Sequence, residues 1–102
     1  MSLYAEAFWT AHKSATSQRI TMAKYKPGNP APLPVASDIE IDPTAESWSS
    51  KTVNVTFGDG DDCEVTFTTV DATGRETAVS TRSTITEAPP AAADLTVVGV
   101  TS

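Results

Sequence analysis

The sequence has few of the side chains that enzymes and nucleic-acid-binding proteins rely on. Its 102 residues include one histidine and one cysteine, so an internal disulfide cannot form. Seven lysines and arginines stand against 13 acids, and the net charge of −6 does not suit a phosphate-binding surface. No apolar run approaches the roughly 20 residues that a membrane-spanning helix needs. The N-terminus lacks the features of a signal peptide, so we expect no export.

The two reactive side chains that are present are not arranged as a catalytic site. His12 lies in a segment with helical spacing, where we expect a solvated surface residue and not a general base. Cys63 lies on the inward side of a predicted strand, where we expect a small core residue and not a nucleophile. We therefore predict that the protein is not an enzyme and uses no cofactor.

The clearest positive feature is the alternation of apolar and polar residues in the second half of the chain. Residues 52–57, 63–70 and 75–86 alternate in two-residue steps, and the turn sequences GDGDD and DATG separate them. This pattern is typical of three consecutive antiparallel strands. Further strands are predicted at residues 35–42 and 94–101. The sequence therefore predicts a mainly β protein, a small antiparallel sandwich or barrel of about five or six strands.

The expected register of this meander follows from pairing apolar residues with one another, because opposite residues share a face of the sheet. If residues 58–62 form the first loop, Phe57 lies opposite Cys63. If Gly74 takes the left-handed position after a type I turn, Phe67 lies opposite Val79. The remaining predicted pairs are Val55 with Val65, Val53 with Phe67, Val65 with Thr81, Cys63 with Ser83 and Glu64 with Arg82.

The first third of the chain differs from the rest in charge. Residues 1–26 carry Glu6 as the sole acid against Lys13, Arg19, Lys24 and Lys26, whereas residues 38–102 are strongly acidic. Apolar residues within 2–16 recur at helical spacing, and residues 19–26 could form a strand. The proline-rich residues 27–34 must run extended. We therefore divide the chain into a basic, aromatic arm (1–26), a stiff spacer (27–34) and a β-domain (35–102).

Two interpretations of the arm stay open. In one, a helix packs on the open end of the sandwich with its charges solvated. In the other, the arm binds a neighbouring protein, because aromatic residues are enriched at interfaces and cluster here. The residues expected to contact a partner are Tyr4, Phe8, Trp9, Arg19, Lys24 and Lys26, together with Val98 and Val100 of the terminal strand.

The turn between the first two predicted strands of the meander is crowded with carboxylates. Asp59, Asp61, Asp62 and Glu64 are a candidate calcium site, because calcium prefers clustered oxygen ligands. Their spacing does not follow the EF-hand pattern. A solvated acidic turn is the favoured interpretation, and no other metal site is predicted.

Two stretches of the chain resemble bacterial immunoglobulin-like repeats. In residues 45–57, Trp48 precedes a Val53-x-Val55 strand, and in residues 64–77 a strand runs into the Asp71-x-x-Gly74 turn. The FGDG sequence of residues 57–60 is also similar to a signature of polycystic-kidney-disease-type domains. The resemblance implies an immunoglobulin-like sandwich, abbreviated relative to the usual count of about seven strands.

An unexported, acidic, threonine-rich module of this kind also looks like bacteriophage virion proteins, which assemble in the host cytoplasm. That analogy implies a non-enzymatic capsid decoration (cement) protein. Its partners would be the major capsid protein or another virion protein and other copies of itself, without nucleic acid or membrane. The alternatives are a phage tail or head accessory protein and a bacterial surface module, an adhesin or carbohydrate-contacting domain, that binds through the acidic loop or an outer threonine face.

Overall fold

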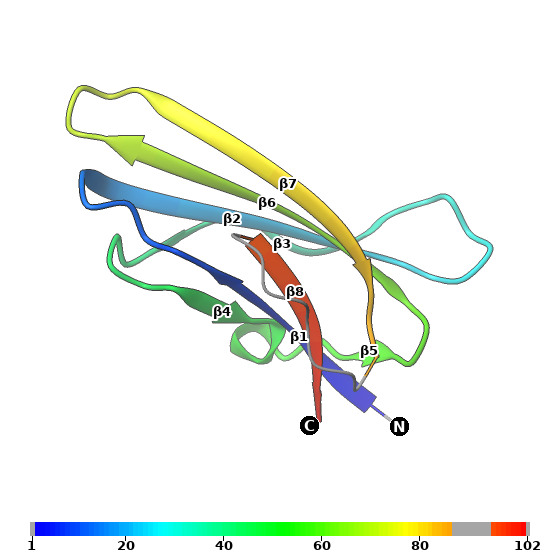
Figure 1. Cartoon of the computed structure of the whole chain (residues 1–102). Helices are drawn as coiled ribbons and strands as arrows, with labels where there is room; N and C mark the ends of the chain where they lie inside the picture. Colours follow the sequence, from blue (N-terminus) through cyan, green and yellow to red (C-terminus); the bar gives the residue numbers. More distant parts are fainter. Residues whose placement is uncertain (1, 87–94, 102) are drawn as a thin grey trace.

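The computed structural model describes residues 2–86 and 95–101, which form two antiparallel sheets packed against each other (Figure 1). In one sheet β1 is central, with β4 and β5 on one side and β8 on the other; the second sheet has the order β3-β2-β6-β7. The strands are β1 (Ser2–Trp9), β2 (Ala15–Tyr25), β3 (Leu33–Ile41), β4 (Ser47–Ser49), β5 (Phe57–Gly58), β6 (Asp62–Asp71), β7 (Glu76–Thr84) and β8 (Leu95–Thr101). The predicted mainly β, sandwich-like architecture is confirmed.

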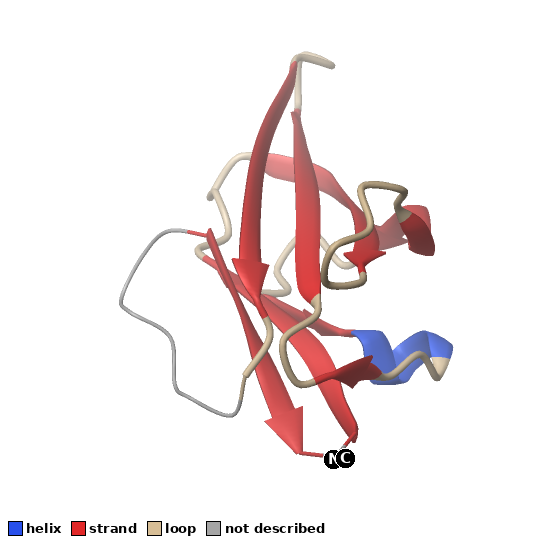
Figure 2. Cartoon of the chain, turned by 90° about the vertical axis from the view of Figure 1, so that its right-hand side faces the viewer, coloured by secondary structure: helices blue, strands red, loops and turns tan. Residues whose placement is uncertain are grey.

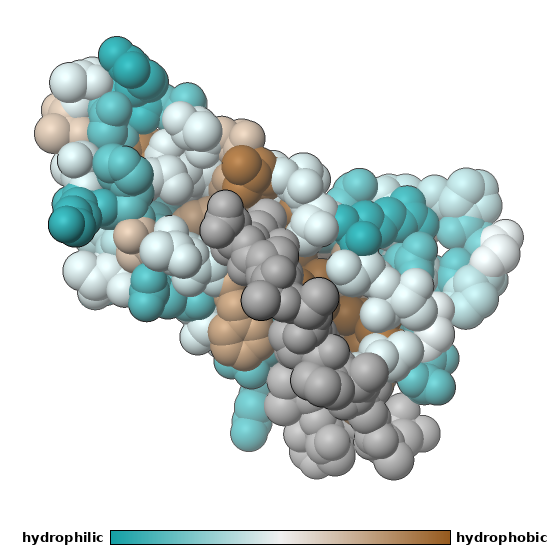
Figure 3. Space-filling view, in the orientation of Figure 1, coloured by the Kyte–Doolittle hydropathy of each residue, from teal (hydrophilic) through white to brown (hydrophobic). Residues whose placement is uncertain are grey.

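The hydrophobic core fills the space between the two sheets. The rings of Trp9 and Phe67 meet across it, with centroids 4.5 Å apart. Its other buried members are Leu3, Ala5, Ala7, Ile20, Met22, Ala36, Trp48, Phe57, Cys63, Val65, Ile85 and Val97. On the side seen in Figure 3, apolar positions gather toward the middle, and hydrophilic ones lie toward both ends. Within the described part of the chain, no helix is long and apolar enough to cross a membrane.

The helix predicted within residues 2–16 is wrong. Residues 2–9 form β1, in which Leu3, Ala5, Ala7 and Trp9 are all buried, so the true period is two. Small alanines occupy two of those inward positions, which hides the alternation from a hydropathy pattern. β1 also supplies the central strand of its sheet, and its first residues lie beside the last residues of β8 (Figure 2).

The strand predicted at residues 19–26 exists as β2, and it lies in the interior of the other sheet. β2 has β3 on one side and β6 on the other. Residues 26–32 connect β2 to β3, which are antiparallel neighbours, so the proline-rich segment links two strands of one sheet. Among the described residues, the predicted arm and spacer are therefore parts of the sandwich and not a separate extension.

The first hairpin of the predicted meander is wrong, and the second is confirmed. Residues 50–53 form a short 3₁₀ helix that ends at a left-handed Asn54, and β5 pairs with β1. β2 takes the place expected for residues 52–57, because Ile20 lies opposite Phe67 and Met22 opposite Val65. The β6–β7 register agrees with the prediction at Phe67–Val79, Val65–Thr81, Cys63–Ser83 and Glu64–Arg82, and Gly74 has a φ of 84°.

Candidate functional site

The three aromatic residues predicted to anchor a partner lie in different environments. Trp9 is buried, and its indole N–H donates to the backbone carbonyl of Ala45 at 2.8 Å. Tyr4 is half-buried, with the Lys51 Nζ 5.9 Å from its ring centroid. Phe8 is 38% exposed. Of the three, Phe8 is the one whose ring is most available to a partner.

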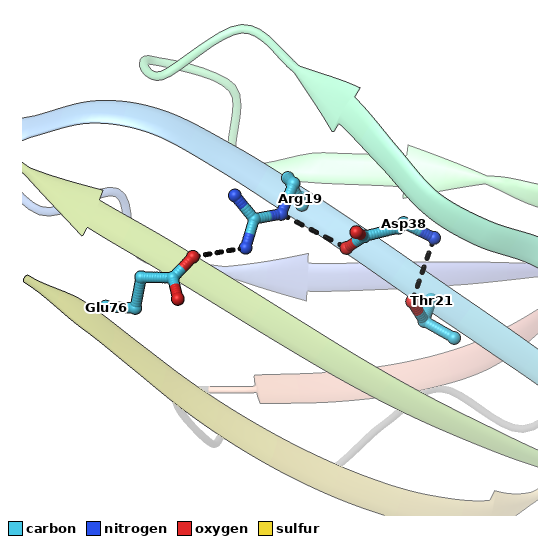
Figure 4. Close-up of polar contacts among 4 residues, drawn as sticks. All are labelled: Arg19, Thr21, Asp38 and Glu76. Atoms are coloured by element: carbon cyan, nitrogen blue, oxygen red, sulfur yellow. Dashed lines mark hydrogen bonds and ion pairs between the residues drawn. The ribbon is translucent and has the colours of Figure 1, made fainter. Parts of the chain in front are cut away.

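Arg19 holds three strands together on the outer face of the second sheet (Figure 4). Its guanidinium forms an ion pair with Asp38 of β3 at 3.1 Å and another with Glu76 of β7, reaching across β6. The hydrogen bonds to Glu76 and then to Asp38 raise the pKa of Arg19. Asp38 has a φ of 53° at an irregularity in the β2–β3 ladder, and its N–H donates to the Thr21 hydroxyl at 2.9 Å. The guanidinium of Arg19 is therefore paired with carboxylates of its own chain.

Lys24 and Lys26 are also engaged inside the molecule. Lys24 Nζ donates to the carbonyl of Thr56 at 2.9 Å and lies 5.4 Å from the centroid of the Phe57 ring. Lys26 Nζ pairs with Asp61 at 2.9 Å. The side chains of Val98 and Val100 lie outside the described residues, while their backbones pair with those of Glu6 and Tyr4. Of the predicted contact residues, Trp9, Arg19, Lys24 and Lys26 therefore have partners within the chain.

The acidic turn is not solvated throughout, as the sequence interpretation had it, because Asp61 at its centre is buried. The side chain of Asp61 is 4% exposed and accepts a hydrogen bond from the Gly58 N–H at 2.8 Å. Burial opposes its charged form, but the Gly58 N–H and the Lys26 ammonium outweigh that effect and lower the pKa of Asp61. The backbone of Asp61 also pairs with Ile85, which fixes the loop to the end of β7.

The four carboxylates proposed as calcium ligands have separate surroundings. Asp62 accepts hydrogen bonds from Arg82 Nε at 3.1 Å and from the Thr84 hydroxyl at 2.9 Å. Glu64 accepts one from the Tyr25 hydroxyl at 3.3 Å, and Asp59 is exposed. Within residues 2–86 and 95–101, no group of three or more histidine, cysteine or acidic side chains is placed to hold a metal ion.

Cys63 is a core residue, as predicted. It is fully buried, and burial followed by the nearby charge of Glu64 raises the pKa of its thiol to about 12. The thiolate form that reacts with electrophiles is therefore scarce at neutral pH.

A groove of about 380 Å³ lies where the β1–β2 and β6–β7 turns meet. It is lined by His12, Thr69, Asp71, Arg75 and Thr77. His12 Nδ1 accepts a hydrogen bond from the Ser14 N–H at 3.1 Å, which leaves Nε2 as the donor of the neutral ring. Hydrogen bonds from the Thr73 hydroxyl and then the Arg75 N–H lower the pKa of Asp71. Thr69 lies opposite Thr77 in the β6–β7 ladder, whereas His12 comes from the turn between β1 and β2.

The edge of the second sheet is a further surface that the sequence prediction did not single out. β7 is nine residues long, and within the described part of the structure it pairs with β6 alone. Glu76 to Ser80 are all exposed, and Val79 is 50% exposed.

Comparisons of the chain with protein-family models, curated proteins and solved structures find no match.

Proposed function

We propose that this protein is a non-enzymatic structural protein of a bacteriophage virion, with an immunoglobulin-like sandwich that decorates the capsid. The observation that supports an assembly role is the exposed edge of β7, because a strand edge that is unpaired among the described residues is a ready surface for pairing with another chain. The phage assignment rests on the sequence resemblance. The proposed partners are the major capsid protein and further copies of this chain, assembled in the host cytoplasm.

The proposed attachment surface is the outer side of the first sheet around Phe8. This residue replaces the arm in the original hypothesis, because Trp9, Arg19, Lys24 and Lys26 are held within the sandwich. An exposed aromatic ring is a typical anchor for a protein contact.

Particle composition tests the proposal directly. Virions purified by density gradient from cells that produce the protein should contain it in amounts comparable to the major capsid protein, as measured by quantitative peptide mass spectrometry. Particles lacking the protein should rebind the purified wild type and not Phe8→Asp, whereas Leu33→Asp, at another exposed apolar position, should bind normally. Absence from purified virions, or presence in trace amounts only, would show that the proposed function is wrong.

The groove at the β1–β2 and β6–β7 turns favours a second candidate function, binding of a small molecule such as a saccharide by a bacterial surface module, because its lining residues offer hydrogen-bonding groups beside apolar surface. Its volume of about 380 Å³ suits one small ligand. Calorimetric titration with an oligosaccharide panel should then find a ligand whose affinity falls at least about tenfold in Arg75→Ala. Lys13→Ala, an exposed basic residue that does not line the groove, is the control. Lack of heat with every sugar at millimolar concentration would reject this candidate.

A further inference from the structure

We propose that β7 is a self-association edge, along which a second copy of this chain pairs in antiparallel orientation. The inference rests on the assembly role proposed above and names a partner for it. Two neighbouring copies would then share one continuous sheet, because each contributes its β3-β2-β6-β7 sheet.

The two edges of this sheet differ in how well they can accept another strand. The β2–β3 ladder has two register irregularities, and β3 contains Pro34 and a left-handed Asp38. Bulges and prolines of this kind block further pairing. β7 pairs with β6 over nine consecutive residues without a register shift and contains no proline, glycine or lysine. Among residues 2–86 and 95–101, β7 is therefore the edge strand that is more open to a new strand.

The direction of the backbone groups along β7 limits the possible pairings. Asp71 N–H donates to the Arg75 carbonyl at the start of the hairpin. Because bonded and non-bonded pairs alternate in an antiparallel ladder, the odd-numbered residues of β7 direct their N–H and C=O groups toward β6. The even-numbered residues from Glu76 to Thr84 direct theirs away from the sheet. A new strand must therefore form its hydrogen bonds with the even-numbered positions.

In one register of the two β7 strands, an apolar residue lies opposite an apolar residue and an acidic residue lies opposite a basic one. With the twofold axis at Val79, this half-exposed side chain packs on Val79 of the second copy. Glu76 then lies opposite Arg82 of the second copy, and the same pair recurs on the other side of the axis. Ala78 and Ser80, both even-numbered, lie opposite each other as a hydrogen-bonded pair. Moving the axis by one residue, to Ser80, places Arg82 opposite Ala78 and Val79 opposite Thr81, and loses both matches.

The pair between Glu76 and Arg82 of the second copy determines the register of the two strands and adds little to the strength of the contact. Glu76 already pairs with Arg19, and Arg82 with Asp62, within one chain. Both also lie on the exposed outer face, where charge pairs are weak. Complementary charges still disfavour the alternative registers, in which they would be unmatched. The new backbone hydrogen bonds and the Val79 contact supply the attraction.

Sedimentation equilibrium of the full-length protein tests this pairing. The wild type should be a reversible dimer, and Val79→Lys should raise the dissociation constant at least about tenfold, because it places two like charges opposite each other. Leu33→Lys is the matched control, since Leu33 is 43% exposed on the opposite edge strand and should leave the dimer unchanged. Circular dichroism melts should confirm that both variants are folded.

A cysteine substitution tests the register itself. Val79→Cys should form a disulfide-linked dimer on mild oxidation, because the Cα atoms of a non-hydrogen-bonded pair lie about 4.5 Å apart. Ser80→Cys, adjacent on the same exposed strand, should cross-link much less. The native Cys63 is buried and does not interfere.

These outcomes separate this inference from the proposed function. A wild type that stays monomeric at millimolar concentration, or a dimer equally weakened by Leu33→Lys, would overturn self-association through β7. Equal cross-linking of the two cysteine variants would overturn the register. The protein could still be found in purified virions in each case, so only the particle analysis decides the proposed function.

Discussion

At the scale of single residues, the polar side chains that looked available in the sequence are mostly structural. Asp61 illustrates the reason, because two of its three partners, Lys26 and Ile85, come from distant parts of the chain. It accepts from Gly58 and Lys26, and its backbone pairs with Ile85. A turn rich in acids is normally solvated, but here Asp61 is buried and its carboxylate is stabilised by the Lys26 ammonium and the Gly58 N–H. Its neighbour Asp59 stays exposed.

Asp61→Asn should destabilise the protein in a pH-dependent way. The folded-state pKa of Asp61 is lowered, so the charged carboxylate contributes stability above its unfolded-state pKa of about 3.9, and this contribution disappears as the pH falls through the folded-state pKa. Urea unfolding should show a loss of about 2 kcal/mol at pH 7. The difference between variant and wild type should shrink steadily below about pH 4.

Asp59→Asn provides the matched control for that experiment. It removes a carboxylate from the same turn, but this side chain is exposed and makes no hydrogen bond or ion pair within the described residues. Its unfolding free energy should follow that of the wild type across the pH range. A constant deficit of Asp61→Asn from pH 7 to pH 2 would contradict the role of the charge.

At the scale of elements, the difference between the two predicted hairpins lies in how local their signals are. The β6–β7 turn is determined by neighbouring residues: Asp71 Oδ1 accepts hydrogen bonds from Thr73 and Arg75, and Gly74 takes the left-handed position. Residues 52–57 have equally good alternation. They do not pair with β6, because the buried Ser50 hydroxyl donates to the Val55 carbonyl and accepts from the Ala5 N–H. That contact requires β1 and is invisible locally.

Gly74→Ala should weaken this hairpin through its backbone. The φ of 84° disfavours any side chain, and a Cβ at this position would meet no atom within 4 Å, so the cost is conformational and not steric. We expect a loss of about 1 kcal/mol in the free energy of unfolding measured in urea. Gly74→Asn should recover part of the loss, because asparagine tolerates the left-handed region. Equal losses for the two variants would point to a contact that the glycine makes instead.

At the scale of the whole molecule, the chain places its first two strands in different sheets. β1 is the central strand of one sheet and β2 an interior strand of the other. Each is therefore flanked on both sides by segments from later in the chain, and the Trp9–Phe67 ring contact joins the layers. The N-terminal quarter of the sequence is thus a requirement for both sheets.

Deleting residues 1–26 should consequently abolish folding and not merely partner binding. The truncated chain would lose β1 and β2 and with them the buried side chains that they contribute. We expect no cooperative thermal transition and no near-ultraviolet circular dichroism. Deletion of residue 1 alone is a suitable control, because it leaves both strands intact. A truncated protein that still melts cooperatively would restore the hypothesis of a separate arm.

The sequence by itself determined the β class, two further strands, and the β6–β7 hairpin with its register, because these depend on alternation and turn chemistry within a few residues. It also placed Cys63 in the core. Only the tertiary structure decided that residues 2–9 are a central strand, that β2 and not residues 52–57 lies beside β6, and that Asp61 is buried. Each of these depends on partners far away in the chain, and a hydropathy pattern does not record which strands meet.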